Sequence, residues 1–159
     1  MPDELSYKKI TFMHRTHVDS LMRNVANEIR KRGKLHDVSK LSGIEFSFGE
    51  MYFDGYIKAN KYYATVPDVN EYNKNMAPAF AEHYKHNDHH VEHFKKGLPD
   101  MNLLQLTEFL CDEFAYMRER GYVKYECIEE IERRLSSYGA SEDLISIAKN
   151  TIAYFYEEE

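Results

Sequence analysis

Hydrophobic residues recur every three to five positions along most of the chain, which is the period of an amphipathic helix. The first such pattern runs from about Leu5 to Arg32, and Gly33 predicts its end. Its apolar positions are Ile10, Met13, Val18, Leu21, Val25 and Ile29. Ser42-Gly-Ile-Glu45 then has the form of a capping box. We therefore expect a second helix from Ser42 to about Phe53. Glu45 could support a site from outside its donor group, but the capping box explains it at least as well, so we leave it out of the site.

The segment 54–75 has no clear period and is rich in asparagine and tyrosine. We interpret it as a lid over a site or as a surface loop that packs its own aromatic side chains. The next helix is expected to begin near Met76, with Pro78 in its first turn, and to carry a group of histidines. Gly97-Leu-Pro99-Asp100 should end it.

Three more helical patterns complete the chain. The first spans Leu103 to Arg120 and is apolar on most of its circumference, which indicates a central buried helix. The second contains Ile128 and Leu135, and the third follows a cap at Ser141. The 159 residues include only 7 Gly and 4 Pro, which argues against a turn-rich sandwich or barrel. We predict an all-α fold over residues 1–159, a single-domain bundle of about six helices.

The net charge of −6, from 21 basic and 27 acidic residues, disfavours binding to a nucleic-acid polymer. It is compatible with a small phosphorylated ligand held by a metal. No apolar run approaches the roughly 18 residues of a membrane span, and Met1 to Lys9 is polar. We expect a cytoplasmic protein that binds no membrane; the sequence leaves open whether it forms a homo-oligomer.

Five of the eight histidines lie between positions 83 and 93. On an uninterrupted helix, the spacing of His83, His86, His90 and His93 would place four imidazoles on one face, where a metal or a carboxylate must separate them. His89 would then point elsewhere. Because asparagine and aspartate are weak helix formers, we expect the helix to break at 87–88, which would let His89 and His90 act together.

His36-Asp37 is a second candidate group. Adjacent residues point about 100° apart on a helix, so both reach one ion only at a bend or a helix end. Imidazole nitrogen with carboxylate oxygen suits Zn, Mn, Fe or Ni better than Ca. His14 and His17 both lie on the first apolar stripe, and periodicity does not choose between them.

Asp112 lies on an aromatic face of the central helix, between Phe109 and Tyr116. A buried carboxylate needs a cationic partner, because an unpaired one costs several kcal/mol. A metal would serve here, and so would Arg118 or Arg120.

The order His17, His36-Asp37, a histidine-rich helix and Asp112 resembles the H…HD…H…D pattern of the HD-domain metal-dependent phosphohydrolase superfamily, which is all-helical. More closely, three motifs resemble a family of small proteins of unknown function from phages and bacteria, over nearly the whole chain. The motifs are His36-Asp-Val-Ser-Lys40, His83-x-x-x-Asn87-x-His89-His90 and Leu110-Cys-Asp112.

The resemblance implies one or two divalent transition metal ions: Mn, Fe, Zn, Ni or Co. Its implied ligands for one ion are His17, His36, Asp37 and Asp112. Those for a second ion are His83, His89 and His90, with Asp37 bridging. The resemblance selects His17 over His14 by the spacing to the HD pair. It also places Lys40 at the centre as a catalytic residue beside Asp37. It implies no role for His86 and His93.

The function implied is a phosphohydrolase that attacks a small phosphorylated substrate, a nucleotide, with metal-activated water. The Gly-Tyr-Pro motif of the cyclic-dinucleotide branch is absent, so that substrate is not implied. Met13 replaces the glutamate that holds a third metal, so we expect two ions at most. Two alternatives stay open: a di-iron oxygenase of the same fold, and a non-catalytic phage-type protein that binds a metal or a nucleotide.

Overall fold

The computed structural model describes residues 6–59 and 65–156, and within these ranges every regular element is helical. Seven α-helices and three short 3₁₀ helices follow one another without a strand in the described part, which confirms the all-α prediction. The chain divides into two units, Met1–His36 and Asp37–Glu159, and each is described by itself.

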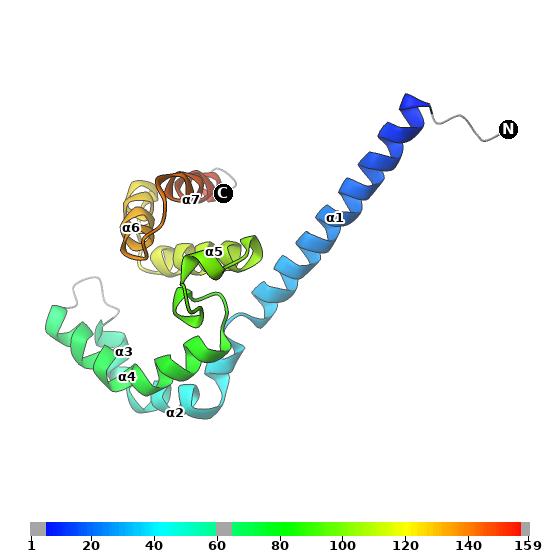
Figure 1. The fold of residues 1–159 in the computed structure, drawn as a ribbon. Coiled ribbons are helices and arrows are strands. Elements are labelled where there is room, and N and C mark those ends of the chain that lie inside the picture. Colours follow the sequence, from blue (N-terminus) through cyan, green and yellow to red (C-terminus); the bar gives the residue numbers. More distant parts are fainter. Residues whose placement is uncertain (1–5, 60–64, 157–159) are drawn as a thin grey trace. The chain divides into compact units, whose positions relative to one another are not determined.

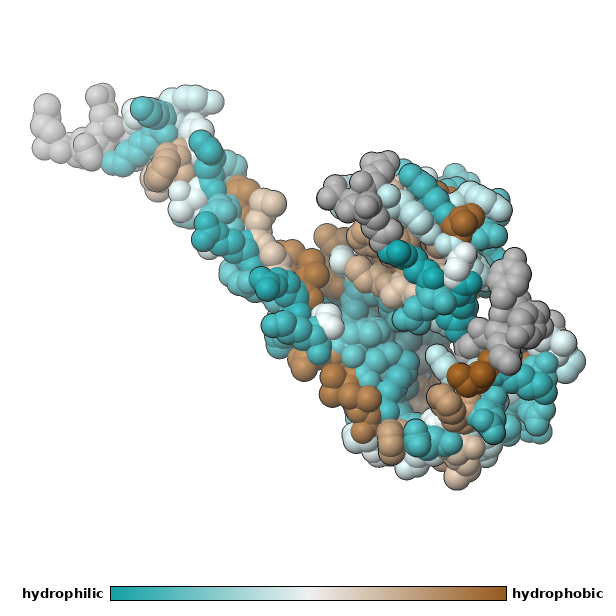
Figure 2. Space-filling model, turned by 180° about the vertical axis from the view of Figure 1, so that it is seen from behind, coloured by the Kyte–Doolittle hydropathy of each residue, from teal (hydrophilic) through white to brown (hydrophobic). Residues whose placement is uncertain are grey.

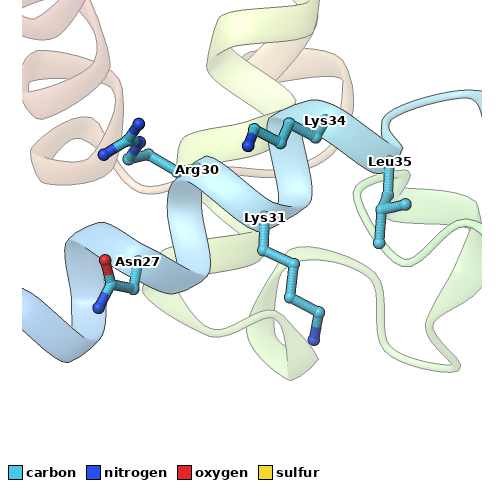
Figure 3. Close-up of a pocket in the computed structure, with 5 residues that line it drawn as sticks. All are labelled: Asn27, Arg30, Lys31, Lys34 and Leu35. Atoms are coloured by element: carbon cyan, nitrogen blue, oxygen red, sulfur yellow. The ribbon is translucent and has the colours of Figure 1, made fainter.

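The first unit consists of the 29-residue helix α1, Tyr7–Leu35. The Ser6 hydroxyl caps it by accepting a hydrogen bond from the Lys9 amide. Within this unit, taken by itself, none of the helix residues is buried. Hydrophobic side chains are accordingly exposed along its length (Figure 2). Near its C-terminal end, a surface pocket with three basic side chains is lined by Asn27, Arg30, Lys31, Lys34 and Leu35 (Figure 3).

The second unit begins with the 3₁₀ helix η1, Val38–Leu41, and the helices α2, Gly43–Met51, and α3, Phe53–Ala59. Both α2 and α3 pack against α4, Val66–His86 (Figure 1). The segment 54–75, interpreted above as a lid or loop, is therefore helical over 54–59 and 66–75, with Thr65 as an extended cap residue, and residues 60–64 lie outside the described part. Tertiary packing, such as the edge-on contact of Tyr56 with Tyr72, stabilises helix in a sequence whose asparagines disfavour it.

Helix α4 also begins ten residues earlier than the expected start at Met76. Thr65 caps it through its hydroxyl, which accepts from the Asp68 amide, and Pro67 occupies the first turn. Pro78 lies inside the helix and not in its first turn, so the position that the sequence predicted for it is wrong. The buried neighbours Met76 and Ala79 anchor this part of α4 against the rest of the unit.

Helix α4 ends at His86, with Asn87 as its C-cap in an extended conformation. The break expected at 87–88 is confirmed. Two 3₁₀ helices follow, η2 at Val91–His93 and η3 at Leu98–Asp100. The side chains of Val91 and Leu98 are buried in the hydrophobic core, which ties this irregular segment to the C-terminal helices.

The C-terminal helices are α5, Leu103–Glu119, α6, Lys124–Ser137, and α7, Glu142–Phe155, close to their predicted positions. They pack on one another (Figure 1) around fully buried side chains: Met117, Cys127, Ile131, Leu135, Ala148 and Ile152. Asn102 and Gln105 form a reciprocal capping box that fixes the start of α5. No helix in the described ranges has the length and apolarity to cross a bilayer.

Candidate metal centre

Four side chains of the second unit converge on one point: Asp37, His83, His89 and His90. Each offers one ligand atom, and these four atoms lie within 4.8 Å of one another. The Nε2 atoms of His83 and His90 are 2.8 Å apart. Asp37 Oδ1 lies 3.2 Å from His83 Nε2 and 3.5 Å from His89 Nε2. Three imidazole nitrogens and one carboxylate oxygen thus face a shared position.

The spacing of these donors fits a shared metal ion. Ligand atoms bound at about 2.1 Å stand roughly 3.0–3.4 Å apart around an octahedral or tetrahedral ion. The three donor–donor distances of 2.8, 3.2 and 3.5 Å bracket that range. Imidazole and carboxylate donors together suit Zn, Mn, Fe, Co or Ni. The chemistry and the spacing of the group therefore agree with the predicted cofactor class.

The backbone at Asp37 explains how its carboxylate reaches this point. Asp37 follows His36, the C-cap of α1, and adopts φ 55°, ψ 15°, the left-handed region. It is the sole non-glycine residue with positive φ in the described part of the chain. Asparagine and aspartate tolerate this conformation better than other residues do, and such outliers concentrate at functional sites. The bend that the adjacent His36-Asp37 pair needed is therefore present.

The histidines reach the centre because α4 stops where it does. His83 lies in its last turn, whereas His89 and His90 follow the break and are free of helical geometry. The ring centroids of His89 and His90 are 4.2 Å apart, so two sequence neighbours point to the same side. His83 and His89 are buried. A regular helix would have separated the pair by about 100°.

Carboxylates outside the donor group hold two of the rings by their other nitrogen. His83 Nδ1 lies 2.6 Å from Glu45 Oε2, and His89 Nδ1 lies 3.3 Å from Glu108 Oε1. With Nδ1–H donating to a carboxylate, Nε2 keeps its lone pair and faces the centre. The capping role assigned to Glu45 is wrong: Ser42 makes no side-chain cap hydrogen bond, and the Glu45 side chain is buried against His83.

A small polar network surrounds the Glu45–His83 pair. The Ser39 hydroxyl donates to Glu45 Oε2 at 3.0 Å. The Asn87 amide nitrogen donates to Ser39 Oγ at 2.9 Å and to the His83 carbonyl at 2.9 Å. One network thus joins η1, α2 and the end of α4, which border the centre together with the loop that carries His89 and His90.

One face of α5 supports the loop that carries His89. The Gln105 amide donates to Asp88 Oδ2 at 2.6 Å, and Glu108 contacts His89. One turn further, a carboxylate oxygen of Asp112 lies within 4.8 Å of a ring nitrogen of His89. The three positions are spaced by three and four residues, so they share a side of the helix.

The electrostatics favour the forms that bind metal. Burial would raise the pKa of Asp37, but hydrogen bonds from His83, His89 and Lys40 and the charge of Lys40 bring it far below its usual range. Burial, together with the neighbouring His89 and His83, lowers the pKa of His90 to about 3. Asp37 is therefore an anion and His90 a neutral imidazole near pH 7, as metal ligands must be.

Lys40 lies beside the centre on η1. Its ammonium donates to Asp37 Oδ2 at 2.5 Å, the oxygen that does not face the histidines, and its side chain is half exposed. A solvent-accessible cation at the rim of an anionic centre can meet an incoming phosphate.

The structure brings together five of the seven predicted ligands within the second unit. Asp37, His83, His89 and His90 form the group, with Asp112 close to His89. His17 and His36 belong to the unit Met1–His36, so their ligation stays a prediction.

The two histidines that were given no role lie outside the group. His86 is exposed and its ring contacts Glu82 at 2.8 Å. His93 is also exposed and its Nδ1 lies 2.8 Å from the Tyr84 carbonyl. The 3, 4, 3 spacing of the histidines therefore does not make a shared helical face, since α4 ends before His90.

Sequence reasoning left Glu45 out of the site and missed Glu108, and both contact the histidine rings. Glu108 had a detectable signal, because it precedes Asp112 by one turn on a largely apolar helix. Glu45 stands among Ile44, Phe46 and Phe48, where an acid in an apolar run indicates a buried partner. Its coincidence with a capping-box pattern concealed that signal.

Comparison with known proteins places the chain in a family and goes no further. Searches of curated proteins and of solved structures gave no match. A sequence profile matches residues 3–157, which include every donor described above. The chain therefore belongs to DUF5662, a family of unknown function.

Proposed function

We propose that this protein is a metal-dependent phosphohydrolase that acts on a small phosphorylated compound, most concretely a nucleotide. The observation that carries the proposal is the convergence of Asp37, His83, His89 and His90 on one point at metal-ligand spacing. A divalent ion held there supplies Lewis acidity toward a phosphoryl oxygen and lowers the pKa of bound water.

The chain's own residues have distinct tasks in this proposal. The three histidines and Asp37 hold the ion, and His17, His36 and Asp112 are the candidates for a second one that Asp37 would bridge. Lys40 neutralises Asp37 Oδ2 and offers its ammonium to a substrate phosphate. The order of these residues along the chain resembles that of the HD-domain phosphohydrolases, which supports hydrolysis as the reaction.

Metal analysis and a substrate panel test the proposal together. We would purify the full chain, load it with Mn²⁺, Fe²⁺ or Zn²⁺, measure bound metal, and follow phosphate release from mono-, di-, tri- and cyclic nucleotides. Asp37→Asn should lose both metal and turnover, by more than the roughly 10–100-fold that loss of an outer hydrogen-bond partner costs. Asp54→Asn is the matched control, because Asp54 is an exposed acid on α3.

The outcomes separate the alternatives. Less than one ion per wild-type chain after loading would overturn the metal centre. Bound metal without phosphate release from any nucleotide would overturn the hydrolase. In that case, an iron chromophore with oxygen consumption would point to the oxygenase, and unfolding on metal removal would point to a structural, non-catalytic ion.

A further inference from the structure

We propose that Glu45 is a positioning residue that sets the metal affinity of the centre through His83. The inference rests on the metal centre of the proposed function, but it requires no turnover. Glu45 and His83 come from different helices, α2 and α4, and both side chains are buried. Their 2.6 Å contact is shorter than the contacts of Asp37 with His83 and His89 and the contact of Glu108 with His89.

The contact controls which nitrogen of His83 faces the ion. A ring that donates Nδ1–H to a carboxylate is held as the tautomer with a free Nε2 lone pair, and the carboxylate makes that lone pair more basic. His83 Nε2 lies 2.8 Å from His90 Nε2 and 3.2 Å from Asp37 Oδ1. Without Glu45, the ring could rotate or place its proton on Nε2, where it would block the ion.

Ser39 and Asn87 make Glu45 a fixed partner. The Ser39 hydroxyl occupies the same oxygen of Glu45 that contacts His83, and Asn87 in turn holds Ser39. The carboxylate is therefore oriented from two sides before any metal arrives. A partner held in this way costs little further ordering when the ion binds.

Glu108 has the same relation to His89 in a looser form. Its oxygen lies 3.3 Å from His89 Nδ1, against 2.6 Å for the Glu45 contact. A longer hydrogen bond is weaker, so the carboxylate of Glu108 polarises its ring less than Glu45 does. We therefore expect the loss of metal affinity to be larger when Glu45 is replaced than when Glu108 is replaced.

The experiment measures Zn²⁺ affinity of the full chain by competition with a chromophoric chelator. Glu45→Gln should weaken affinity about 10–100-fold, and Glu108→Gln should weaken it less. Glu50→Gln is the matched control, because it removes the same charge from an exposed position on the same helix, and it should change affinity less than about threefold. Urea denaturation of the metal-free variants separates a folding defect from a binding defect.

A double-mutant cycle tests the route of the effect. If Glu45 acts through the imidazole, Glu45→Gln should have no further effect on the residual affinity of His83→Ala. A loss that persists in the His83→Ala background would overturn the positioning role, since Glu45 would then act on the ion itself. An unchanged affinity in Glu45→Gln would overturn it as well.

The metal-free protein supplies a readout that is independent of activity. Nitrogen-15 chemical shifts report the tautomer of His83, and the wild type should show Nδ1 protonated and Nε2 unprotonated. Glu45→Ala should lose this preference. Equal tautomer populations in the wild type would contradict the inference. Zn²⁺ binding with no hydrolysis would leave the inference standing while the proposed function fails.

Discussion

Removal of Arg134 should destabilise the protein in a strongly pH-dependent way. The Arg134 guanidinium on α6 contacts the buried Glu113 carboxylate on α5, and its Nε donates to Glu130 at 2.8 Å. Burial raises the pKa of Glu113, and the charge of Arg134 opposes that rise. Arg134→Met keeps much of the apolar stem but leaves the carboxylate without this cation. The pair matters for the site because it joins α5 to α6, and earlier turns of α5 contact the histidine loop through Gln105 and Glu108.

The size of the effect follows from the cost of protonating Glu113. An unpaired buried carboxylate takes up a proton instead of remaining charged, which costs about 1.4 kcal/mol per pH unit above its ordinary pKa. From the ordinary value of 4.5, the loss is at most about 3.5 kcal/mol at pH 7 and about 1.5 kcal/mol at pH 5.5. With the pKa raised in the folded state, that state binds more protons than the unfolded one, so the variant loses stability as the pH rises.

Urea denaturation followed by circular dichroism at pH 5.5 and pH 7 measures these values, and the melting temperature at pH 7 should fall by about 6–12 °C. Adding Glu113→Gln to Arg134→Met should restore most of the loss, because no charge is then left buried. Arg133→Met is the control, since Arg133 is largely exposed. A deficit that is equal at both pH values, or that Glu113→Gln does not relieve, would refute the reasoning.

Three further predictions concern the stability of α5 and α6. Ile131→Ala should cost about 2–5 kcal/mol in urea denaturation, because the side chain is fully buried, whereas Ile147→Ala at a 57% exposed position should cost much less. Asn102→Ala removes the α5 capping box and should lower the unfolding free energy by about 1 kcal/mol; an unchanged urea midpoint would contradict the cap. Hydrogen bonds from Arg133 and Arg134 lower the pKa of Glu130 to about 2, so the stabilisation by this group should be complete above about pH 4.5 and lost as the pH falls toward 2. Carboxyl NMR titration of the wild type and of Arg133→Met would show this, with a higher pKa in the variant.

The regular parts of the fold could be predicted from the sequence because their hydrophobic period and end signals agree. The helix α7 is an example, with Ser141 at its cap and Ala148 and Ile152 on its buried face. The segment 54–75 could not be predicted in this way, since its local preferences oppose helix and its stability comes from contacts with other helices. Tyr72, for instance, packs between Tyr56 and Phe80.

The candidate site was partly predictable for the same reason. The weak helix formers at 87–88 indicated the break that lets His89 and His90 point together. Glu45 could not be assigned, because a capping glutamate and a buried partner of histidine share one sequence pattern. Only the contact with His83, 38 positions away, distinguishes them.

The centre is built from two irregular backbone segments, and each is anchored by groups that do not donate to the ion. The left-handed turn at Asp37 leads into η1, where Ser39 bonds Glu45 and Asn87. The loop that carries the histidine pair is held at its start by Gln105 on α5. These anchors are contacts between protein groups, so the convergence of the donors is built into the fold of the second unit. Burial of His90 and the neighbouring His89 and His83 lower the pKa of His90, which leaves its imidazole neutral and able to bind a cation.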